Sequence, residues 1–315
     1  MYIFLLFIFF QSLLAANNCT ENRLLICGVC RNVSGAIDNT IKSIEDLGSH
    51  FSDYTVIIYE NNSSDDTAEK LTSWAKTNPK VVLLHETLST KKLNLSRTTR
   101  IAKARNKVLA EARKKKYSSY KYLVMADLDF RHHWPTQEIT QSINQAFDWD
   151  CISANGITES GMYYDRFAYR SREFPFGPEL LDGDFWADLG PNDQGTWFTL
   201  TQNGWPQVYS AFGGLAIYKT ATITQFTYSG TATKQLKKYY QNILSRTPSD
   251  TPHLIKYKNL NAKKAKDIIF RKNCVAWQLP KDKSIAVCEH VTLHAAMALK
   301  GHGIFYINPK LIMRY

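Results

Sequence analysis

The sequence predicts an α/β protein with a mixed, mostly parallel sheet flanked by helices. Between residues 23 and 130, short apolar runs alternate with segments of helical spacing, as in successive β-α-β units. The run Tyr122–Phe130 is apolar up to its acidic end, as expected of a strand buried on both faces. Polar loops follow the expected strands, and ligands bind beyond the carboxyl ends of such strands.

Each element of the first half follows from its own pattern. Strands are expected over Arg23–Cys30, Tyr54–Tyr59, Val81–Leu84 and Tyr122–Phe130, and helices over Ala36–Leu47, Thr67–Lys76 and Thr98–Lys116. In the first helix apolar residues recur at positions 37, 41, 44 and 47, and Gly48 ends it. Arg100, Lys103 and Lys107 share one face of the third helix, which would be a solvated helix face.

After residue 130 the chain becomes rich in loops. Strands are expected over Asp150–Gly156 and Ala211–Tyr218, and the glycines at 213 and 214 permit close backbone approach. Aromatic residues and carboxylates gather between 162 and 205, among them Trp186, Trp197, Trp205, Glu179, Asp182, Asp184, Asp188 and Asp193. They either stack on the sugar rings of a bound glycan or pack a loop-rich subdomain. Residues 228–266 are basic and give no clear pattern.

A targeting segment is expected before the folded domain. Residues 1–16 are nearly all apolar, with a core over Tyr2–Phe10 and small residues at 15 and 16. This length suits a signal peptide, whereas a membrane-spanning helix needs ~20 apolar residues. We expect a cleaved signal and entry into the secretory pathway, in the ER or Golgi lumen or outside the cell. A short membrane anchor and an N-terminal core strand are the alternatives. Residues 17–315 then form a single domain.

Composition limits the classes of partner. The 315-residue chain has a net charge of +11, which suits an anionic partner or reflects a general surface excess of lysine. Because no nucleic-acid signature is present, we expect no nucleic-acid partner. Five N-x-[ST] triplets, at Asn18, Asn32, Asn61, Asn62 and Asn94, fit secretory glycosylation.

The six cysteines do not form a zinc pattern. Cys27 and Cys30 make a C-x-x-C, but no second close pair completes a zinc site. We interpret them as buried free thiols, and a disulfide that involves Cys19, Cys274 or Cys288 stays open.

Asp127 and Asp129 end the central strand. Two residues apart on an extended chain, their carboxylates face the same side. Their repulsion is relieved when a cation joins them, and a hard divalent ion shared with phosphate oxygens fits best. The alternative is a strand end with two solvated aspartates, because D-x-D is frequent by chance.

Four segments, in this order, resemble the motifs of one enzyme class. They are Tyr59-Glu-Asn-Asn-Ser-Ser-Asp-Asp-Thr67, Ala104-Arg105-Asn106, Asp127-Leu128-Asp129 and Cys288-Glu-His-Val-Thr-Leu-His294, followed by Gly301 and Ile304–Pro309. Together they resemble metal-dependent nucleotide-sugar glycosyltransferases of the GT-A fold, especially the large inverting family two. The fungal capsule-associated mannosyltransferases are a narrower likeness.

The resemblance implies a donor, an acceptor and a metal. A monosaccharide would pass from a UDP- or GDP-sugar to a hydroxyl of a glycan, glycoprotein or lipid, with Mn²⁺ or Mg²⁺. The nucleotide-binding half would span about residues 22–135 and the acceptor half about 136–315. The resemblance assigns the base and ribose to Cys30, Asn32, Glu60 and Asn61. It brings Arg105 to the nucleotide, gives Asp127 a contact with ribose or metal, and makes Asp129 a metal ligand.

The last motif departs from the family. Where the family has Glu-Asp, this chain has Glu289-His290. The resemblance makes Glu289 the general base, and it lets His290 or His294 complete the metal site. Inverting and retaining outcomes both stay open.

Two other classes remain as alternatives. A sugar nucleotidyltransferase would want a Gly-rich basic loop after the first strand, but residues 30–35 supply one Gly and one Arg. An inactive carbohydrate-binding relative would not need the intact pair Asp127 and Asp129.

Overall fold

The computed structural model describes residues 19–172, 174–181, 204–246, 268–271, 274–277 and 286–315. The expected signal segment 1–16 lies outside these residues, and so do the acidic and aromatic residues expected between 182 and 203. Within the described part of the chain, no helix is long and apolar enough to cross a membrane. Five cysteines there, Cys19, Cys27, Cys30, Cys151 and Cys288, are free and buried.

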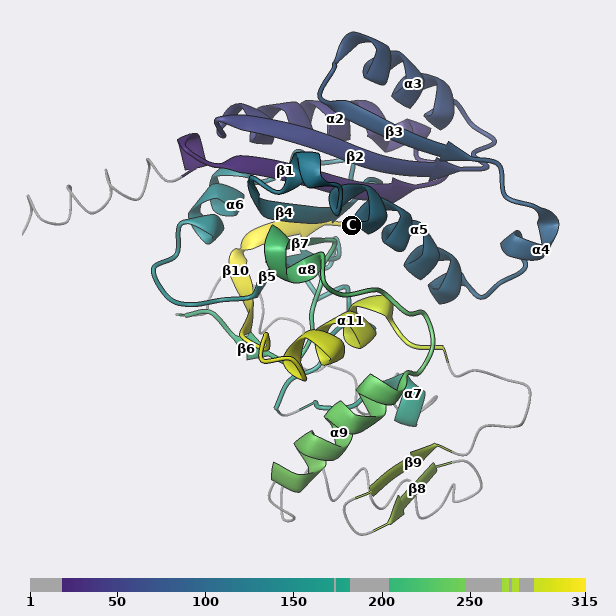
Figure 1. Cartoon of the computed structure of the whole chain (residues 1–315), viewed down its shortest axis with the longest axis vertical. Helices are drawn as coiled ribbons and strands as arrows, with labels where there is room; N and C mark the ends of the chain where they lie inside the picture. Colours follow the sequence, from purple (N-terminus) through teal and green to yellow (C-terminus); the bar gives the residue numbers. More distant parts are fainter. Residues whose placement is uncertain (1–18, 173, 182–203, 247–267, 272–273, 278–285) are drawn as a thin grey trace, which may run out of the picture.

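One eight-stranded sheet forms the centre of the molecule, in the order β3-β2-β1-β4-β7-β5-β10-β6 (Figure 1). Its strands are β1 Arg23–Cys30, β2 Asp53–Asn61, β3 Val81–Glu86, β4 Tyr120–Asp127, β5 Cys151–Ile157, β6 Gln207–Val208, β7 Leu215–Lys219 and β10 Phe305–Arg314. β3, β2, β1 and β4 are mutually parallel, and β5 is parallel to β10, whereas β7 and β6 run antiparallel to their neighbours. The predicted α/β class with a mixed, mostly parallel sheet is confirmed.

Helices cover both faces of this sheet. They are α2 Ser34–Ser49, α3 Thr67–Thr77, α4 Thr90–Leu93, α5 Arg97–Ala112, α6 Thr136–Ile143, α7 Pro178–Leu181, α8 Thr220–Ile223, α9 Lys234–Arg246 and α11 Glu289–Ala298. Apolar residues of α2, α3 and α6 form one core with the sheet, and those of α5, α8, α9 and α11 form a second core on the other face. A separate two-stranded sheet contains β8 Ile268–Arg271 and β9 Cys274–Trp277.

Three predicted boundaries were wrong by three or four residues, whereas other predicted ends differ by one or two. The helix expected to reach Lys116 ends at Ala112, because Arg113 leaves the helix and donates to the carbonyls of Thr224 and Phe226. The central strand ends at Asp127, not at Phe130. The strand expected from residue 211 begins at Leu215, because the two glycines before it have φ of +62° and +88° and form a turn.

Strand register brings the polar strand ends to one edge. Cys30 lies opposite Glu60 in the β1–β2 pair, and Val29 lies opposite Asp127 in the β1–β4 pair. Since the three strands are parallel, their carboxyl ends meet at the same edge of the sheet. The loops that follow them therefore form one continuous surface.

A buried ion pair fixes the loop between β5 and α7. Arg170 donates to both carboxylate oxygens of Glu179, at 3.0 and 2.8 Å, and the Tyr240 hydroxyl of α9 also donates to Glu179. Arg170 and Glu179 are 1% and 0% exposed. From the sequence, Glu179 belonged to residues that either bind a glycan or pack a loop-rich subdomain. The structure supports packing for Glu179, because this carboxylate is buried and fully paired. Its function is to hold the loop against α9.

Removing the Glu179 side chain should make the protein easier to unfold. Glu179→Ala leaves the Arg170 guanidinium buried without its carboxylate, so the free energy of unfolding should fall by ~3–5 kcal/mol. Urea denaturation measures this loss. Asp148→Ala is the control, because Asp148 pairs with Lys219 at 2.9 Å but is 74% exposed. A loss for Glu179→Ala no larger than that of the control would contradict the role of the ion pair.

Candidate functional site

A cavity of about 610 Å³ opens at the carboxyl edge of β1, β2 and β4, beside α5. Its apolar walls come from Val29, Val33, Tyr59, Leu88, Leu95 and Ile101. Cys30, Asn61, Asp127 and Asp129, all singled out from the sequence, also line it. The volume falls within the range of small-molecule sites, and such sites sit at this edge of α/β sheets.

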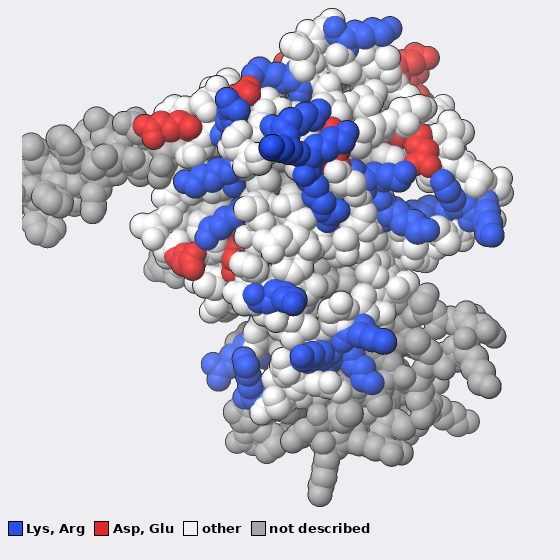
Figure 2. Space-filling model, in the orientation of Figure 1, with Lys and Arg blue, Asp and Glu red and all other residues white. Residues whose placement is uncertain are grey.

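Positive charge dominates the rim of the cavity. Its cationic lining residues are Arg31, Lys92, Arg97, Arg100, Lys103 and Lys107. Figure 2 shows Lys and Arg side chains gathered over α4 and α5. Lys92 and Lys107 pair with Glu86 at 2.9 and 3.3 Å, and these contacts lower the pKa of Glu86 to about 2. The helix face expected to be merely solvated thus borders a cavity suited to an anionic ligand.

Asp127 and Asp129 form the acidic side of the same cavity. Asp129 is exposed, and the Asp127 side chain is 30% exposed. Desolvation raises the pKa of Asp127 to about 7. The Arg105 guanidinium opposes this rise, and the negative charge of Asp129 adds to it. Two carboxylates that repel each other at a cavity rich in cations fit a divalent ion shared with a diphosphate.

The metal ligand set predicted from the sequence is not assembled. Within the described residues, no group of three or more His, Cys, Asp and Glu could hold a metal ion. The described residues therefore supply two protein ligands for a metal ion, Asp127 and Asp129. This number suffices for Mg²⁺ or Mn²⁺ when phosphate oxygens and water supply the rest.

His290 and His294 lie in the interior, away from the cavity lining. Nδ1 of His294 contacts the Ser210 hydroxyl at 2.9 Å and its Nε2 contacts the Tyr218 hydroxyl at 3.0 Å. His290 stacks on Phe212, with ring centroids 3.8 Å apart, and contacts the guanidinium of Arg105. Burial lowers the pKa of His294 to about 3 and that of His290 well below its usual value. Both rings are held by buried polar partners, so the structure gives them a role in packing and not the predicted role as metal ligands.

The predicted nucleotide contacts divide into two groups. Cys30 and Asn61 line the cavity, whereas Asn32 and Glu60 shape the loop behind it. Asn32 has φ of +56°, and its side-chain oxygen accepts from the backbone N–H of Ser64 at 2.8 Å. Glu60 is buried, accepts from the Ser63 N–H at 2.9 Å and contacts His85 at 2.5 Å. Asn32 and Glu60 therefore position the loop between β2 and α3, which contains Ser63 and Ser64.

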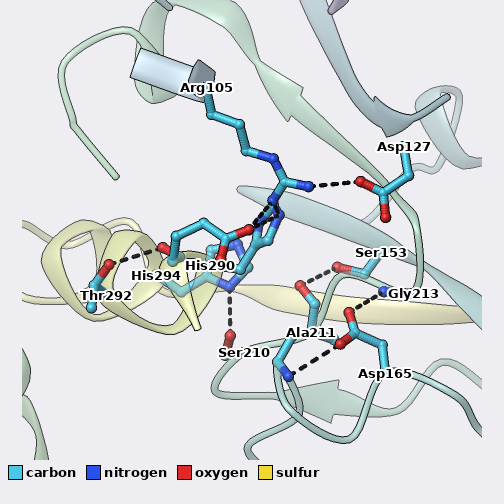
Figure 3. A network of polar contacts seen from close by, with 12 residues as sticks. Arg105, Asp127, Ser153, Asp165, Ser210, Ala211, Gly213, His290, Thr292 and His294 are labelled. Atoms are coloured by element: carbon cyan, nitrogen blue, oxygen red, sulfur yellow. Dashed lines mark hydrogen bonds and ion pairs between the residues drawn. The ribbon is translucent and has the colours of Figure 1, made fainter. Parts of the chain in front are cut away.

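Arg105 lies beneath the cavity, not in its lining. Figure 3 shows its side chain running from α5 to Asp127 on one side and to α11 on the other. It donates to Asp127 Oδ1 at 2.8 Å and to Glu289 Oε1 at 2.5 Å, and it is 3% exposed. Burial lowers its pKa, but the carboxylates of Glu289 and Asp127 outweigh this effect and raise it. Arg105 was expected at the nucleotide from the sequence, whereas in the structure it is the cation between two carboxylates.

Asp165 is a carboxylate that sequence reasoning missed. It lies in the loop after β5 and accepts from the backbone N–H groups of Gly213 at 3.1 Å and Ala168 at 3.3 Å (Figure 3). Desolvation raises its pKa to about 6, and the Glu289 charge contributes to the rise. Asp165 also raises the pKa of Asp127, so the two carboxylates are electrostatic neighbours. The one available signal was an acidic residue shortly after a predicted strand.

Residues 26–136 match the model of the family described as Glycosyl transferase family 2. This segment runs from β1 into α6 and includes both Asp127 and Asp129. The resemblance to glycosyltransferase family two predicted from the motifs is thereby confirmed for residues 26–136. The narrower likeness to the capsule-associated mannosyltransferases stays a prediction. No curated protein matches the chain significantly.

Distant similarities are found among solved structures. A Pyrobaculum calidifontis mannosyltransferase, in complex with GDP-Man and Mn²⁺, has a TM-score of 0.43 and 12% identity, covering 98% of this chain and 65% of that one. S. aureus TarS 1-349 in complex with UDP has a TM-score of 0.38 and 13% identity, covering 76% and 72%. A longer S. aureus TarS structure has a TM-score of 0.36 and 14% identity, covering 65% and 30%. This chain therefore spans 65% of the mannosyltransferase and 30% of the longer TarS.

Replacing Arg105 should make stability depend more steeply on pH. Arg105→Met removes the cation that lowers the Asp127 pKa, so that pKa should rise further above the unfolded value of ~3.9. Between these two values the native state binds more protons than the unfolded state, so its stability falls as pH rises. We expect a loss of ~3–5 kcal/mol at pH 8 and a smaller loss at pH 5.

Urea unfolding in EDTA at several pH values measures this dependence. Arg113→Met is the matched control, because Arg113 follows the same helix but donates to backbone carbonyls. Its penalty should not change with pH. Equal penalties for Arg105→Met at pH 5 and pH 8 would show that Arg105 does not balance the carboxylates.

Proposed function

We propose that this protein is a glycosyltransferase that moves a hexose from a UDP- or GDP-sugar to an acceptor hydroxyl, with a divalent metal. The single observation that carries the proposal is the cation-rimmed cavity that contains Asp127 and Asp129. A nucleoside diphosphate has an apolar base, which suits the apolar walls, and an anionic diphosphate, which suits the rim. The family match over residues 26–136 supports the same reaction class. A place in the secretory pathway remains our prediction from residues 1–16.

The donor half of the reaction needs charge balance. As the bond from the anomeric carbon to the diphosphate breaks, the electron pair leaves with the nucleoside diphosphate. A bound Mn²⁺ or Mg²⁺ would neutralise part of that charge as a Lewis acid. Asp127 and Asp129 would hold the ion, and Arg105 would keep the Asp127 carboxylate in place through its 2.8 Å contact. The lysines and arginines of the rim would offset the remaining phosphate charge.

The acceptor half needs a base. As the acceptor oxygen attacks the anomeric carbon, its proton must pass to a nearby group. Glu289, expected from the sequence to be this base, is held at 2.5 Å by a guanidinium. Asp165 hydrogen-bonds only two backbone N–H groups among the described residues, and its pKa of about 6 lies near the operating range of a general base. We therefore assign proton acceptance to Asp165 and the positioning of Arg105 to Glu289.

Nucleotide binding should require both the metal and Asp129. We expect UDP or GDP to raise the melting temperature in Mn²⁺ and to have a much smaller effect in EDTA. At a ligand concentration of 100 Kd the stabilisation is ~2.7 kcal/mol. Asp129→Asn removes the charge but keeps the shape, so the Mn²⁺-dependent part of the shift should disappear and turnover should fall by ~10² or more.

The matched control for this experiment is Asp148→Asn. Asp148 is an exposed carboxylate paired with Lys219 and is not part of the cavity lining. It should show the wild-type shift. A nucleotide shift of full size in EDTA, or in Asp129→Asn, would refute the metal role.

Comparing two carboxylate variants identifies the base. Asp165→Asn should keep the Mn²⁺-dependent nucleotide shift and lose transfer by ~10²–10⁴. Glu289→Gln keeps a hydrogen-bond acceptor for Arg105, so its loss of transfer should be smaller. In the wild type, kcat/KM should rise with pH through about 6, because the base acts in its deprotonated form. If Glu289→Gln loses transfer and Asp165→Asn does not, the base is Glu289, as the resemblance implied.

A further inference from the structure

An exposed aromatic pair lies beside the candidate site. The rings of Tyr164 and Tyr315 are stacked, with centroids 3.6 Å apart and an interplanar angle of 21°. Tyr164 is 49% exposed and is among the few large apolar side chains of the described residues that face solvent. Within the described part of the chain, Tyr315 is its only aromatic neighbour. One face of Tyr164 is therefore supported by a second ring, and much of the side chain faces solvent.

The backbone holds this pair at the carboxyl edge of the sheet. Tyr164 donates its backbone N–H to Gly156 at 2.8 Å, and Tyr315 donates its own to Ile157 at 3.0 Å. Gly156 and Ile157 end β5, which runs parallel to β10. The pair thus occupies the same edge of the sheet as the carboxyl ends of β1 and β4.

The pair is also tied to the candidate catalytic carboxylates. The Tyr315 hydroxyl donates to Asp127 Oδ2 at 3.4 Å, and the Phe130 ring packs edge-on against Tyr315 at 4.9 Å. Asp165 directly follows Tyr164 in the sequence. Burial, followed by the nearby Asp165 charge, raises the pKa of Tyr164. The aromatic pair is therefore a neighbour of Asp127, proposed to hold the metal, and of Asp165, proposed to accept the proton.

Two glycines make this arrangement possible. Gly214 has φ of +88°, and a Cβ there would lie 2.2 Å from Phe130 and 2.6 Å from the Tyr315 hydroxyl. Gly213, with φ of +62°, donates its N–H to Asp165. Gly214 thus leaves space for the Tyr315 hydroxyl, and Gly213 donates a hydrogen bond to Asp165.

We propose that Tyr164, supported by Tyr315, is the acceptor subsite and stacks on a pyranose ring. This proposal rests on the proposed function and names its acceptor class, a glycan. A pyranose presents C–H groups on its face and hydroxyls at its edge. The negative face of an aromatic ring attracts the C–H groups, and the Asp165 carboxylate beside it accepts a hydrogen bond from a ring hydroxyl. An extended peptide or a lipid chain has no flat face of this kind with hydroxyls around it.

Saturation-transfer NMR with simple pyranosides tests the subsite. The probes are the methyl glycosides of glucose, mannose, galactose and N-acetylglucosamine, without nucleotide. At least one should receive saturation, strongest on the ring protons of one face. Tyr164→Ala should weaken binding of that glycoside about 3- to 10-fold, as expected for the loss of one aromatic contact. Tyr164→Phe keeps the ring and should bind as the wild type does.

Phe147→Ala is the matched control for this experiment. Phe147 is 37% exposed but precedes β5, at the opposite end of that strand, and packs against Trp205 and Tyr306. Its removal should leave glycoside binding unchanged. Melting temperatures confirm that each variant is folded, which half-exposed Tyr164 should permit. The absence of a Tyr164-dependent signal for all four glycosides would overturn the proposal.

The subsite and the proposed function fail in different ways. If the glycosides bind through Tyr164 but no nucleoside diphosphate raises the melting temperature, the proposed function is wrong and the subsite stands as a carbohydrate-binding surface. If nucleotides bind and Tyr164→Ala transfers the sugar to a peptide or lipid acceptor at the wild-type rate, the acceptor subsite is wrong.

Discussion

The buried guanidinium of Arg105 is the contact on which the arrangement of the site depends. It joins Asp127, 22 residues further along the chain, to Glu289, 184 residues further along. The Arg105 guanidinium and the Glu289 carboxylate, 3% and 8% exposed, would each be costly to bury alone. Only when α5, β4 and α11 pack together are all three charges paired. The ion pairs therefore connect the strand that ends in the D-x-D motif with the helix of the last motif.

The same contact holds the Asp127 carboxylate of the candidate metal site in a fixed orientation. Arg105 takes one oxygen of Asp127, and the Tyr315 hydroxyl contacts the other at 3.4 Å. The Asp127 carboxylate is thus oriented before any ligand arrives, while Asp129 remains exposed. The lysines and arginines of the cavity rim would attract a diphosphate to this point. The residues that would attract the diphosphate differ from those that orient the Asp127 carboxylate, so mutations can separate the two effects.

The sequence was sufficient for those features that depend on local pattern and strand polarity. Asp127 lies at the cavity because it ends a buried strand in a parallel sheet. The buried strand can be inferred from residues 122–129, and the parallel sheet from the alternation of strands and helices over residues 23–130. Cys30 and Asn61 follow by the same reasoning. Arg105 did not, because a motif on a helix gives residue types but not directions. Its neighbours Ala104 and Asn106 line the cavity, whereas Arg105 points into the core.

The remaining errors concern contacts between residues far apart in the sequence. His294 resembled a metal ligand, but Ser210 and Tyr218, 84 and 76 residues away, satisfy its ring nitrogens. Asp165 and Tyr164 lie in a loop without periodicity, so no local pattern indicates that strands β5 and β10 bring them to the site. Tyr315 becomes their neighbour only through the parallel pairing of those strands.

Direct measurement of turnover tests the central claim, that this site transfers a hexose from a nucleotide sugar. The protein is incubated with a panel of UDP- and GDP-sugars, Mn²⁺ and mixed glycan acceptors, and the products are identified by mass spectrometry. We expect release of a nucleoside diphosphate from at least one donor, with an acceptor that gains one hexose, and no release in EDTA. Release of a nucleoside triphosphate when pyrophosphate is added would instead identify a nucleotidyltransferase. The absence of product from every donor would contradict the assignment of hexose transfer to this site.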